Sequence, residues 1–260
     1  MSRSRSVAPV RLASFNLLHG RSLSDGLVVK GRLAEAVGTL DVDVLGLQEV
    51  DRGQSRSDSR DLTREVAETM GTEHWRFVPA LIGTPGEDWR AAHDADTSGP
   101  AYGVGLVSKY PVQQWRVLRL PAARVKSPIM MPGTRKVVWL TDEPRVAVAA
   151  VIESPIGIIT VATTHLSFVP GWNGAQLRKV CRWLEQLPGP RILLGDLNMP
   201  PPFPAVLSRW SSLAKVPTYP STNPKIQLDH VLASGNVGLV RSVDTPLLPL
   251  SDHRALVITL

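Results

Sequence analysis

Apolar runs alternate with amphipathic segments from residue 10 to the end of the chain. Short apolar runs bounded by Gly, Pro, Asn or Asp are typical of strands, and apolar residues repeated every three to four positions are typical of helices. The pattern predicts strands over Val10–Asn16, Val42–Gln48, Arg76–Ala80, Gly103–Ser108, Val112–Leu120, Arg145–Glu153, Ile156–Thr164, Arg191–Gly195, Leu228–Ala233, Leu239–Val243 and Ala255–Leu260. It predicts helices over Leu27–Leu40, Leu62–Met70, Gly174–Leu187 and Pro204–Trp210.

The order of these elements predicts the fold class. Several strands follow one another without a helix between them, and Pro155-Ile156-Gly157 between two of them indicates a hairpin turn. This order, with a few long helices, indicates a layered α/β domain with mixed sheets. No Pro-, Gly- or Ser-rich linker separates two halves. We therefore expect one domain over residues 10–260, preceded by a disordered basic tail over residues 1–9.

Two long segments, Gly83–Pro100 and Pro121–Glu143, are expected to be loops. Long loops in compact domains are usually functional or disordered. The basic and apolar residues of the second loop include Arg124, Lys126, Arg135, Lys136 and Trp139. A basic loop with apolar tips suits a nucleic-acid groove, and a solvated excursion from the fold explains the same residues equally well.

Composition narrows the expected binding partners of the protein and its expected cellular compartment. The net charge of +6 and the pI near 9.8 favour nucleic acid first and an anionic membrane surface second, although Arg-rich chains are often basic without binding either. The single cysteine, Cys181, excludes an internal disulfide framework and fits a reducing cytoplasm. Without a membrane-length apolar run, an apolar signal segment or heptads, we expect a cytoplasmic monomer with no stable membrane association.

Polar residues gather at the ends of the expected strands. They are Asn16, Glu49, His165, Asp196, Asn198, Asp252 and His253. Side chains at i and i+2 of an extended chain point to one face, so Asp196 and Asn198 can converge on one metal ion or phosphate. Asp229 lies inside an otherwise apolar strand, where a carboxylate needs a partner such as a histidine. Each residue alone has a structural explanation, but together they indicate a site at the strand ends.

Six short segments then carry a family resemblance. They are Ser14-Phe15-Asn16, Leu47-Gln48-Glu49-Val50-Asp51, Thr164-His165-Leu166, Gly195-Asp196-Leu197-Asn198, Leu228-Asp229-His230-Val231 and Ser251-Asp252-His253-Arg254. In this order they resemble the motifs of the endonuclease/exonuclease/phosphatase superfamily, over nearly the whole chain. The resemblance implies a four-layer α/β sandwich, in which two packed mixed β-sheets are flanked by helices and the site lies at one edge.

The resemblance implies a metal site. Glu49 resembles the principal metal-binding carboxylate of the family, with Asn16 and Asp252 near the same cation. Carboxylate and amide oxygens favour Mg²⁺ or Mn²⁺ over zinc, which prefers Cys and His. A hard divalent cation of this kind supplies a Lewis acid for phosphodiester hydrolysis.

The resemblance also implies catalytic roles. Asp196 and Asn198 resemble the pair that orients the nucleophilic water and holds the phosphate. His253 with Asp229 resembles the family's His–Asp dyad, in which the carboxylate fixes the imidazole tautomer and stabilises its protonated form. His165 resembles the histidine that donates to a phosphate oxygen.

Four further residues are expected to contact the substrate. Arg145 resembles a phosphate-contacting arginine of some family members. Tyr102 opens a segment that resembles the family's strand at this position, although Val104 stands where a polar residue is common. Arg124 and Lys126 belong to the basic loop and are expected to contact an anionic substrate.

The motifs do not choose the phosphate ester, because the catalytic core is nearly common to a superfamily of many substrates. The basic charge favours a DNA endonuclease or related nuclease. The alternative is a phosphatase or phosphodiesterase acting on a phospholipid head group or another small phosphate ester. A catalytically inactive binding module is disfavoured, because every core metal and dyad position holds a competent residue.

Overall fold

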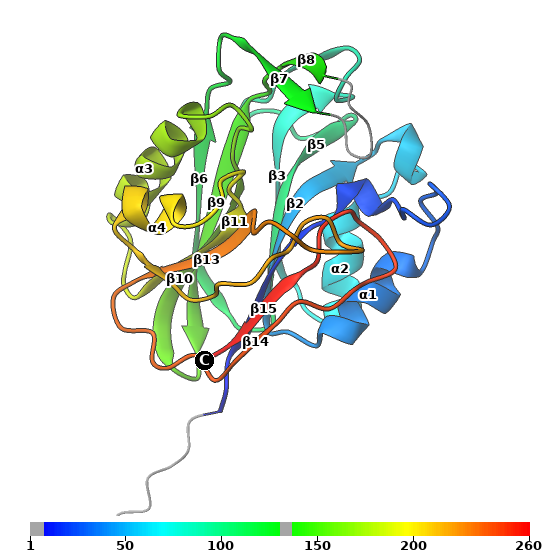
Figure 1. Cartoon of the computed structure of the whole chain (residues 1–260). Helices are drawn as coiled ribbons and strands as arrows, with labels where there is room; N and C mark the ends of the chain where they lie inside the picture. The colour runs from blue at the N-terminus through cyan, green and yellow to red at the C-terminus, as the bar shows by residue number, and fades with distance from the viewer. Residues whose placement is uncertain (1–7, 131–136) are drawn as a thin grey trace, which may run out of the picture.

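The computed structural model describes residues 8–130 and 137–260. Most of the predicted basic tail, together with Arg135 and Lys136, lies outside the described residues. Within them the chain forms a seven-stranded mixed sheet, a six-stranded mixed sheet and a separate two-stranded ribbon (Figure 1). No helix of the described part is both long and apolar enough to cross a membrane.

The elements have the following bounds. In spatial order, the seven-stranded sheet contains β14 (Ser242–Asp244), β15 (Leu256–Thr259), β1 (Arg11–Asn16), β2 (Val44–Arg52), β5 (Ala101–Ser108), β3 (His74–Gly83) and β4 (Trp89–Ala91). The six-stranded sheet contains β12 (Ser211–Ser212), β13 (Asp229–Ser234), β11 (Arg191–Asp196), β10 (Gly157–His165), β9 (Arg145–Ser154) and β6 (Val112–Leu120). The ribbon and the α-helices are β7 (Lys126–Met130), β8 (Val137–Thr141), α1 (Arg32–Leu40), α2 (Leu62–Met70), α3 (Trp172–Leu184) and α4 (Phe203–Ser208).

The apolar side chains of the strands divide between two faces of each sheet, and this division creates the layers. One core lies between the sheets, where Leu12 and Leu106 of one pack with Val148 of the other. A second core packs the opposite face of the seven-stranded sheet against α1 and α2. A third packs the outer face of the six-stranded sheet against α3 and α4. This arrangement confirms the predicted four-layer sandwich.

Helix α1 begins later than the sequence pattern predicts. The expected helix started at Leu27, but Gly31 has φ +90° and the regular helix runs from Arg32 to Leu40. Leu27 and Val29 are exposed, so the apolar residues that suggested an earlier start face solvent. Asp229 is likewise the first residue of its strand, not an interior one.

The two segments expected to be loops contain strands. Residues 89–91 form β4, which pairs with the end of β3. In the second segment, β7 and β8 form an antiparallel ribbon in which Pro128 is opposite Trp139. All of β8 is exposed, so this strand has no buried face whose alternation the sequence could have revealed. The prediction of long unstructured loops was wrong at these two places.

Candidate active site

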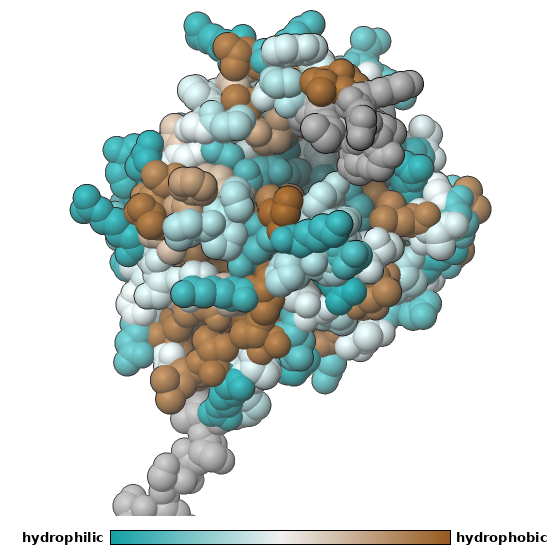
Figure 2. Space-filling model, in the orientation of Figure 1, coloured by the Kyte–Doolittle hydropathy of each residue, from teal (hydrophilic) through white to brown (hydrophobic). Residues whose placement is uncertain are grey.

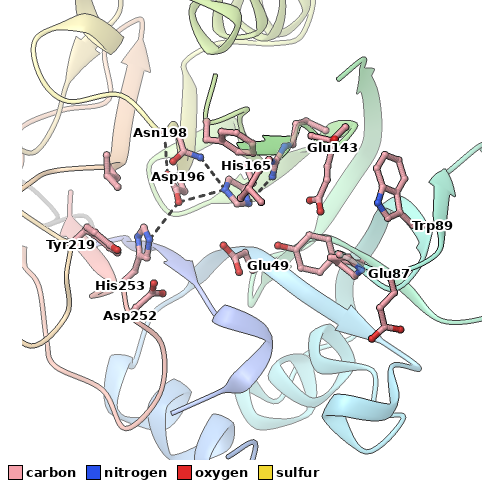
Figure 3. Close-up of a pocket in the computed structure, with 18 of the residues that line it drawn as sticks. Glu49, Glu87, Trp89, Glu143, His165, Asp196, Asn198, Tyr219, Asp252 and His253 are labelled. Carbon is pink, nitrogen blue, oxygen red and sulfur yellow. Dashed lines mark hydrogen bonds and ion pairs between the residues drawn. The ribbon is translucent and has the colours of Figure 1, made fainter. Parts of the chain in front are cut away.

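Strand register explains why distant motif residues meet. Strands β10 and β11 are parallel and place His165 beside Asp196, and β11 and β13 are antiparallel and place Asp196 beside Asp229. In the other sheet, parallel pairing of β1 and β2 places Asn16 beside Gln48, directly before Glu49. The C-terminal ends of β1, β10 and β11 and the N-terminal end of β13 therefore deliver polar side chains from both sheets to one edge of the sandwich (Figure 3).

Glu49 reaches the site through a bulge. The pairing of β2 with β5 shifts register between Leu47 and Val50, and Glu49 adopts φ +53°. A non-glycine residue at positive φ is uncommon, and such strain clusters at functional sites. Burial raises the pKa of the Glu49 carboxyl, and the charge of Asp252 raises it further, against a hydrogen bond from Asn16.

Asn16 connects the two sheets at this point. It is fully buried, and its Nδ2 donates to Glu49 Oε1 at 3.0 Å and to Asp196 Oδ2 at 3.1 Å. Its amide oxygen accepts from the backbone N–H of Leu18 at 3.1 Å. Asn16 therefore presents its nitrogen to the carboxylates and positions them.

The donor chemistry of this region fits a hard divalent cation. Glu49 and Asp252 are two carboxylates whose charges oppose one another, and a cation relieves that repulsion. Asp196, Asp229 and His253 also bring ligand atoms within 4.8 Å of one another. In this second group, however, His253 and Asp229 already bond directly, so the oxygen pair of Glu49 and Asp252 suits Mg²⁺ or Mn²⁺ better.

His253 and Asp229 form a buried hydrogen-bonded pair. The imidazole Nδ1 donates to Asp229 Oδ2 at 2.8 Å, and the backbone N–H of His253 donates to Ser251 Oγ at 3.0 Å. Burial opposes the charge of His253, but Asp229 and Asp196 raise its pKa to about 10. Its Nε2 lies 3.7 Å from Asp196 Oδ2. The side chain is therefore an imidazolium at neutral pH, with Nε2 directed into the site.

Asp196 and Asn198 both lie beside His165, but not through the extended i, i+2 geometry that the sequence suggested, because β11 ends at Asp196 and Asn198 lies in the bend that follows. Asp196 Oδ1 accepts from the backbone N–H of Asn198 at 3.0 Å, and burial raises the pKa of Asp196. Asn198 has φ +50°, and its Nδ2 donates to the Leu166 carbonyl at 2.9 Å while lying 3.2 Å from His165 Nε2. These contacts hold the carboxylate and the amide next to one another and beside His165.

His165 is a neutral imidazole between donors. Burial, Arg145 and His253 lower its pKa well below the ordinary value. Asn198 Nδ2 faces its Nε2, and Arg145 Nη1 lies 3.3 Å from its Nδ1. A neutral ring can accept at only one nitrogen. The other nitrogen is then an N–H that faces a donor, which suits it to an oxygen from an incoming ligand.

Arg145 and Tyr102 line the same cavity. Arg145 is only 6% exposed; its Nη2 lies 3.7 Å from Asp142 Oδ1, and its Nε has no partner among residues 8–130 and 137–260. Burial raises the pKa of Tyr102 well above the ordinary value. The guanidinium of Arg56 lies 5.7 Å from the Tyr102 ring centroid. An anion entering the cavity would therefore meet a buried guanidinium with an unused N–H.

The site opens into a cavity of about 800 Å³. Figure 2 shows the hollow below the β7–β8 ribbon, with hydrophilic residues inside it. Its wall includes residues that were not predicted from the sequence, among them Glu87, Trp89, Glu143 and Phe168, and also Trp139, which was expected in the basic loop. Figure 3 shows Glu87, Trp89 and Glu143 across the cavity from His253. Only the tryptophans gave a signal, as large aromatic residues in segments expected to be loops.

The two basic loop residues lie elsewhere. Arg124 and Lys126 are exposed and are not among the residues that line the cavity. Tyr219, by contrast, lines the cavity, and its ring centroid lies 4.9 Å from that of His253. Tyr219 therefore packs against the imidazole of the dyad.

Comparison with known proteins identifies the family. Residues 13–253 match the model of the Endonuclease/Exonuclease/phosphatase family. The chain belongs to this family. Enzymes of the family hydrolyse phosphoric esters and depend on divalent metal ions. No curated protein matches the sequence significantly.

Solved structures share the fold at low sequence identity. An endonuclease/exonuclease/phosphatase from Beutenbergia cavernae has a TM-score of 0.67 at 19% identity, covering 96% of this chain and 71% of its own. A mannosyl-6-phosphatase from Bacteroides thetaiotaomicron has a TM-score of 0.58 at 13% identity, covering 96% and 99%. Sphingomyelinase C from Streptomyces griseocarneus has a TM-score of 0.59 at 14% identity, covering 97% and 99%. The family fold thus serves sugar and lipid esters as well as nucleic acids.

Proposed function

We propose that the protein is a divalent-metal-dependent phosphodiester hydrolase and that DNA is its first candidate substrate. The observation that carries the proposal is the buried His253–Asp229 pair directed at Asp196, beside the carboxylates of Glu49 and Asp252. Phosphodiester hydrolysis needs a positioned water and neutralisation of charge on the phosphate oxygens. The site contains groups suited to both tasks.

Glu49 and Asp252 would hold Mg²⁺ or Mn²⁺, with Asn16 fixing the Glu49 carboxylate. When bound, the cation supplies Lewis-acid charge next to the phosphate oxygens. Asn16 positions both carboxylates, because its Nδ2 donates to Glu49 and to Asp196. It thereby keeps the metal-binding carboxylate and the water-orienting carboxylate in a fixed relation.

Asp196 would accept a hydrogen bond from the attacking water, while the Asn198 amide holds the phosphate. Burial raises the pKa of Asp196, which makes its carboxylate a stronger base than an exposed one. The imidazolium of His253 would donate from Nε2 to a phosphate oxygen, and Asp229 keeps that charge in place. His165 and Arg145 would donate to the remaining oxygens.

The support for DNA is the net charge of +6, which suits a polyanionic substrate. A second candidate, a small phosphate ester, is favoured by the far wall of the cavity. Glu87 and Glu143 stand there with Trp89 and Trp139. Carboxylates repel a phosphate backbone, whereas an acidic and aromatic wall suits an alcohol group that is neutral or cationic.

The test compares substrates under one metal condition. Supercoiled plasmid, a single-stranded oligonucleotide and a 5′-tailed duplex are incubated with Mg²⁺ or Mn²⁺, beside a hexose phosphate and a phosphocholine diester. His253→Ala should lower the rate by about 10²–10⁴-fold, the usual contribution of a positioned proton donor. His74→Ala, at the remote start of β3, is the matched control and should retain the wild-type rate.

Strand scission that needs metal and His253 would support the nuclease. Hydrolysis of a small ester without scission of any DNA would replace DNA with the second candidate. A folded wild type that cleaves none of these esters with either metal would contradict the hydrolase itself.

A further inference from the structure

A second cleft, of about 660 Å³, lies outside the site described above. It forms where β3 of one sheet approaches β6 of the other, beside the segment that follows β4. Strands β3 and β6 contact one another across the two sheets. Its wall contains the guanidinium groups of Arg52, Arg76, Arg116 and Arg119. The metal and the dyad therefore do not explain this concentration of positive charge.

The carboxylates of this cleft are already paired. Asp94 Oδ1 accepts from Arg119 Nε at 2.8 Å, and Asp96 Oδ1 bonds Arg90 Nη2 at 2.6 Å. Asp96 also accepts from the backbone N–H of His93 at 2.7 Å. The wall thus keeps an excess of positive charge after its internal ion pairs are formed.

Three arginines have no carboxylate partner within the described part of the chain, namely Arg52, Arg76 and Arg116. Arginines on edge strands also prevent strands of other molecules from pairing, which accounts for Arg116 on β6. Arg52 is different, because β2 lies inside its sheet. Its Nη2 is buried without a hydrogen-bond partner among the described residues, and its guanidinium lies 5.0 Å from the Phe77 ring centroid. A buried unpaired donor of this kind indicates an acceptor that arrives from outside.

An aromatic side chain completes the cleft. Trp115 of β6 lines it and is half-buried against the core between the sheets, so the indole is held in place. Guanidinium groups that follow a phosphate backbone, together with an aromatic face on which a base stacks, are the recognition chemistry of single-stranded nucleic acid. A concave space between two sheet edges admits a single strand more readily than a duplex.

We propose that this cleft is an exosite for the phosphate backbone of a single-stranded nucleic-acid segment. Two segments of the chain run from the cleft toward the catalytic cavity. Trp89 at the start of β4 lines the catalytic cavity, while His93 shortly after β4 lines the cleft. On β6, Arg119 of the cleft precedes Leu120, which pairs with Arg145 of the cavity. One single-stranded nucleic-acid segment could thus extend from the cleft into the catalytic cavity. The inference rests on the proposed choice of nucleic acid as substrate.

The experiment measures binding without hydrolysis. A fluorescent single-stranded oligonucleotide of about 20 nucleotides is titrated in EDTA, and its anisotropy is followed at several salt concentrations. Arg76→Glu with Arg116→Glu should weaken binding by about tenfold or more and reduce the salt slope. The control carries Lys179→Glu with Arg182→Glu on the exposed face of α3, which changes the net charge equally. It should leave the affinity within about twofold of wild type. Thermal melting of both variants checks that each is folded.

Equal weakening by both double variants would mean that only overall charge matters, and it would overturn the exosite. So would arginine-dependent binding of inorganic pyrophosphate, or of phosphatidylglycerol vesicles, without binding of the oligonucleotide. If the wild type does not hydrolyse DNA but binds the oligonucleotide through these arginines, the proposed nuclease activity is contradicted and the exosite is still supported. The two proposals therefore fail in distinguishable ways.

Discussion

Replacing Asp229 by Asn removes one buried charge and keeps nearly the same shape. Asp229 is fully buried and accepts from His253 Nδ1 at 2.8 Å. Two unit charges about 4 Å apart at an effective dielectric constant of about 20 interact by about 4 kcal/mol, which corresponds to about 3 pH units. We therefore expect the pKa of His253 to fall from about 10 to about 7 or below in the variant.

Above about pH 7 the rate of the variant should then fall with rising pH relative to that of the wild type, whose His253 stays protonated. At about pH 8 roughly nine-tenths of the variant's His253 would be neutral, which costs about tenfold in rate from protonation alone. At about pH 6 that part of the loss should disappear. The assay follows hydrolysis of bis-p-nitrophenyl phosphate, or of the substrate identified above, from about pH 6 to about pH 9. Asp43→Asn, a single charge removed far from the site, is the control.

Stability gives an independent reading of the same group. The folded pKa of His253 lies above its unfolded value of 6.5. Its contribution to the free energy of unfolding is therefore fully present below pH 6.5 and is lost as pH rises through about 10. In EDTA, the wild type should lose thermal stability across this window more steeply than Asp229→Asn does. Parallel pH profiles of rate for both proteins, or NMR of labelled histidine with a neutral wild-type His253 at about pH 8, would refute the reasoning.

Three further changes test other parts of the structure. Glu49→Gln should weaken Mn²⁺ binding, measured by calorimetry, by at least about tenfold. It should not lower the melting temperature in EDTA, because it removes a buried charge that the charge of Asp252 opposes. An unchanged Mn²⁺ affinity would exclude Glu49 as a ligand. Gly195→Ala should destabilise the fold by about 2 kcal/mol or more, because its Cβ would lie 2.3 Å from the Thr164 carbonyl oxygen. Its control, Gly38→Ala in α1, has open space around the new Cβ and should stabilise the fold by about 0.5–1 kcal/mol. Equal denaturation midpoints for the two variants would contradict this. Burial lowers the pKa of His230, so its neutral form stabilises the fold above pH 6.5 and that contribution is lost as pH falls; His230→Gln should flatten the acid limb of the melting curve, and an unchanged limb would disprove it.

The layered α/β class with mixed sheets could be predicted because most of its strands are short, buried apolar runs, and the resemblance of the six motifs added the four layers. Strand-end positions indicated a site, and the resemblance implied its dyad and carboxylates. Strand register brings several of these residues together, because it fixes which strand ends are neighbours. The bulge at Glu49 was not predictable, because it depends on how β5 pairs with β2. Strand β8 was missed for a different reason, because all of its residues are exposed and no alternation of buried and exposed positions marks it as a strand.

The cavity wall needed the structure as well. Glu87, Trp89 and Glu143 come from segments whose placement depends on contacts far along the chain, and no local pattern marks them as neighbours. Side-chain orientation was equally hidden. The sequence placed Asn16 near a cation, but only the geometry shows its nitrogen directed at Glu49 and Asp196.

The chain completes its two sheets in an unequal order. Residues of the six-stranded sheet are all in place by Ser234, but the seven-stranded sheet gains β15 only near the end. Asp229 therefore exists before the segment that carries its partner His253, and a nascent chain on the ribosome can bury neither the carboxylate nor the imidazole correctly until that segment emerges. A chain that stops before residue 253 therefore contains Asp229 without the imidazole that bonds it.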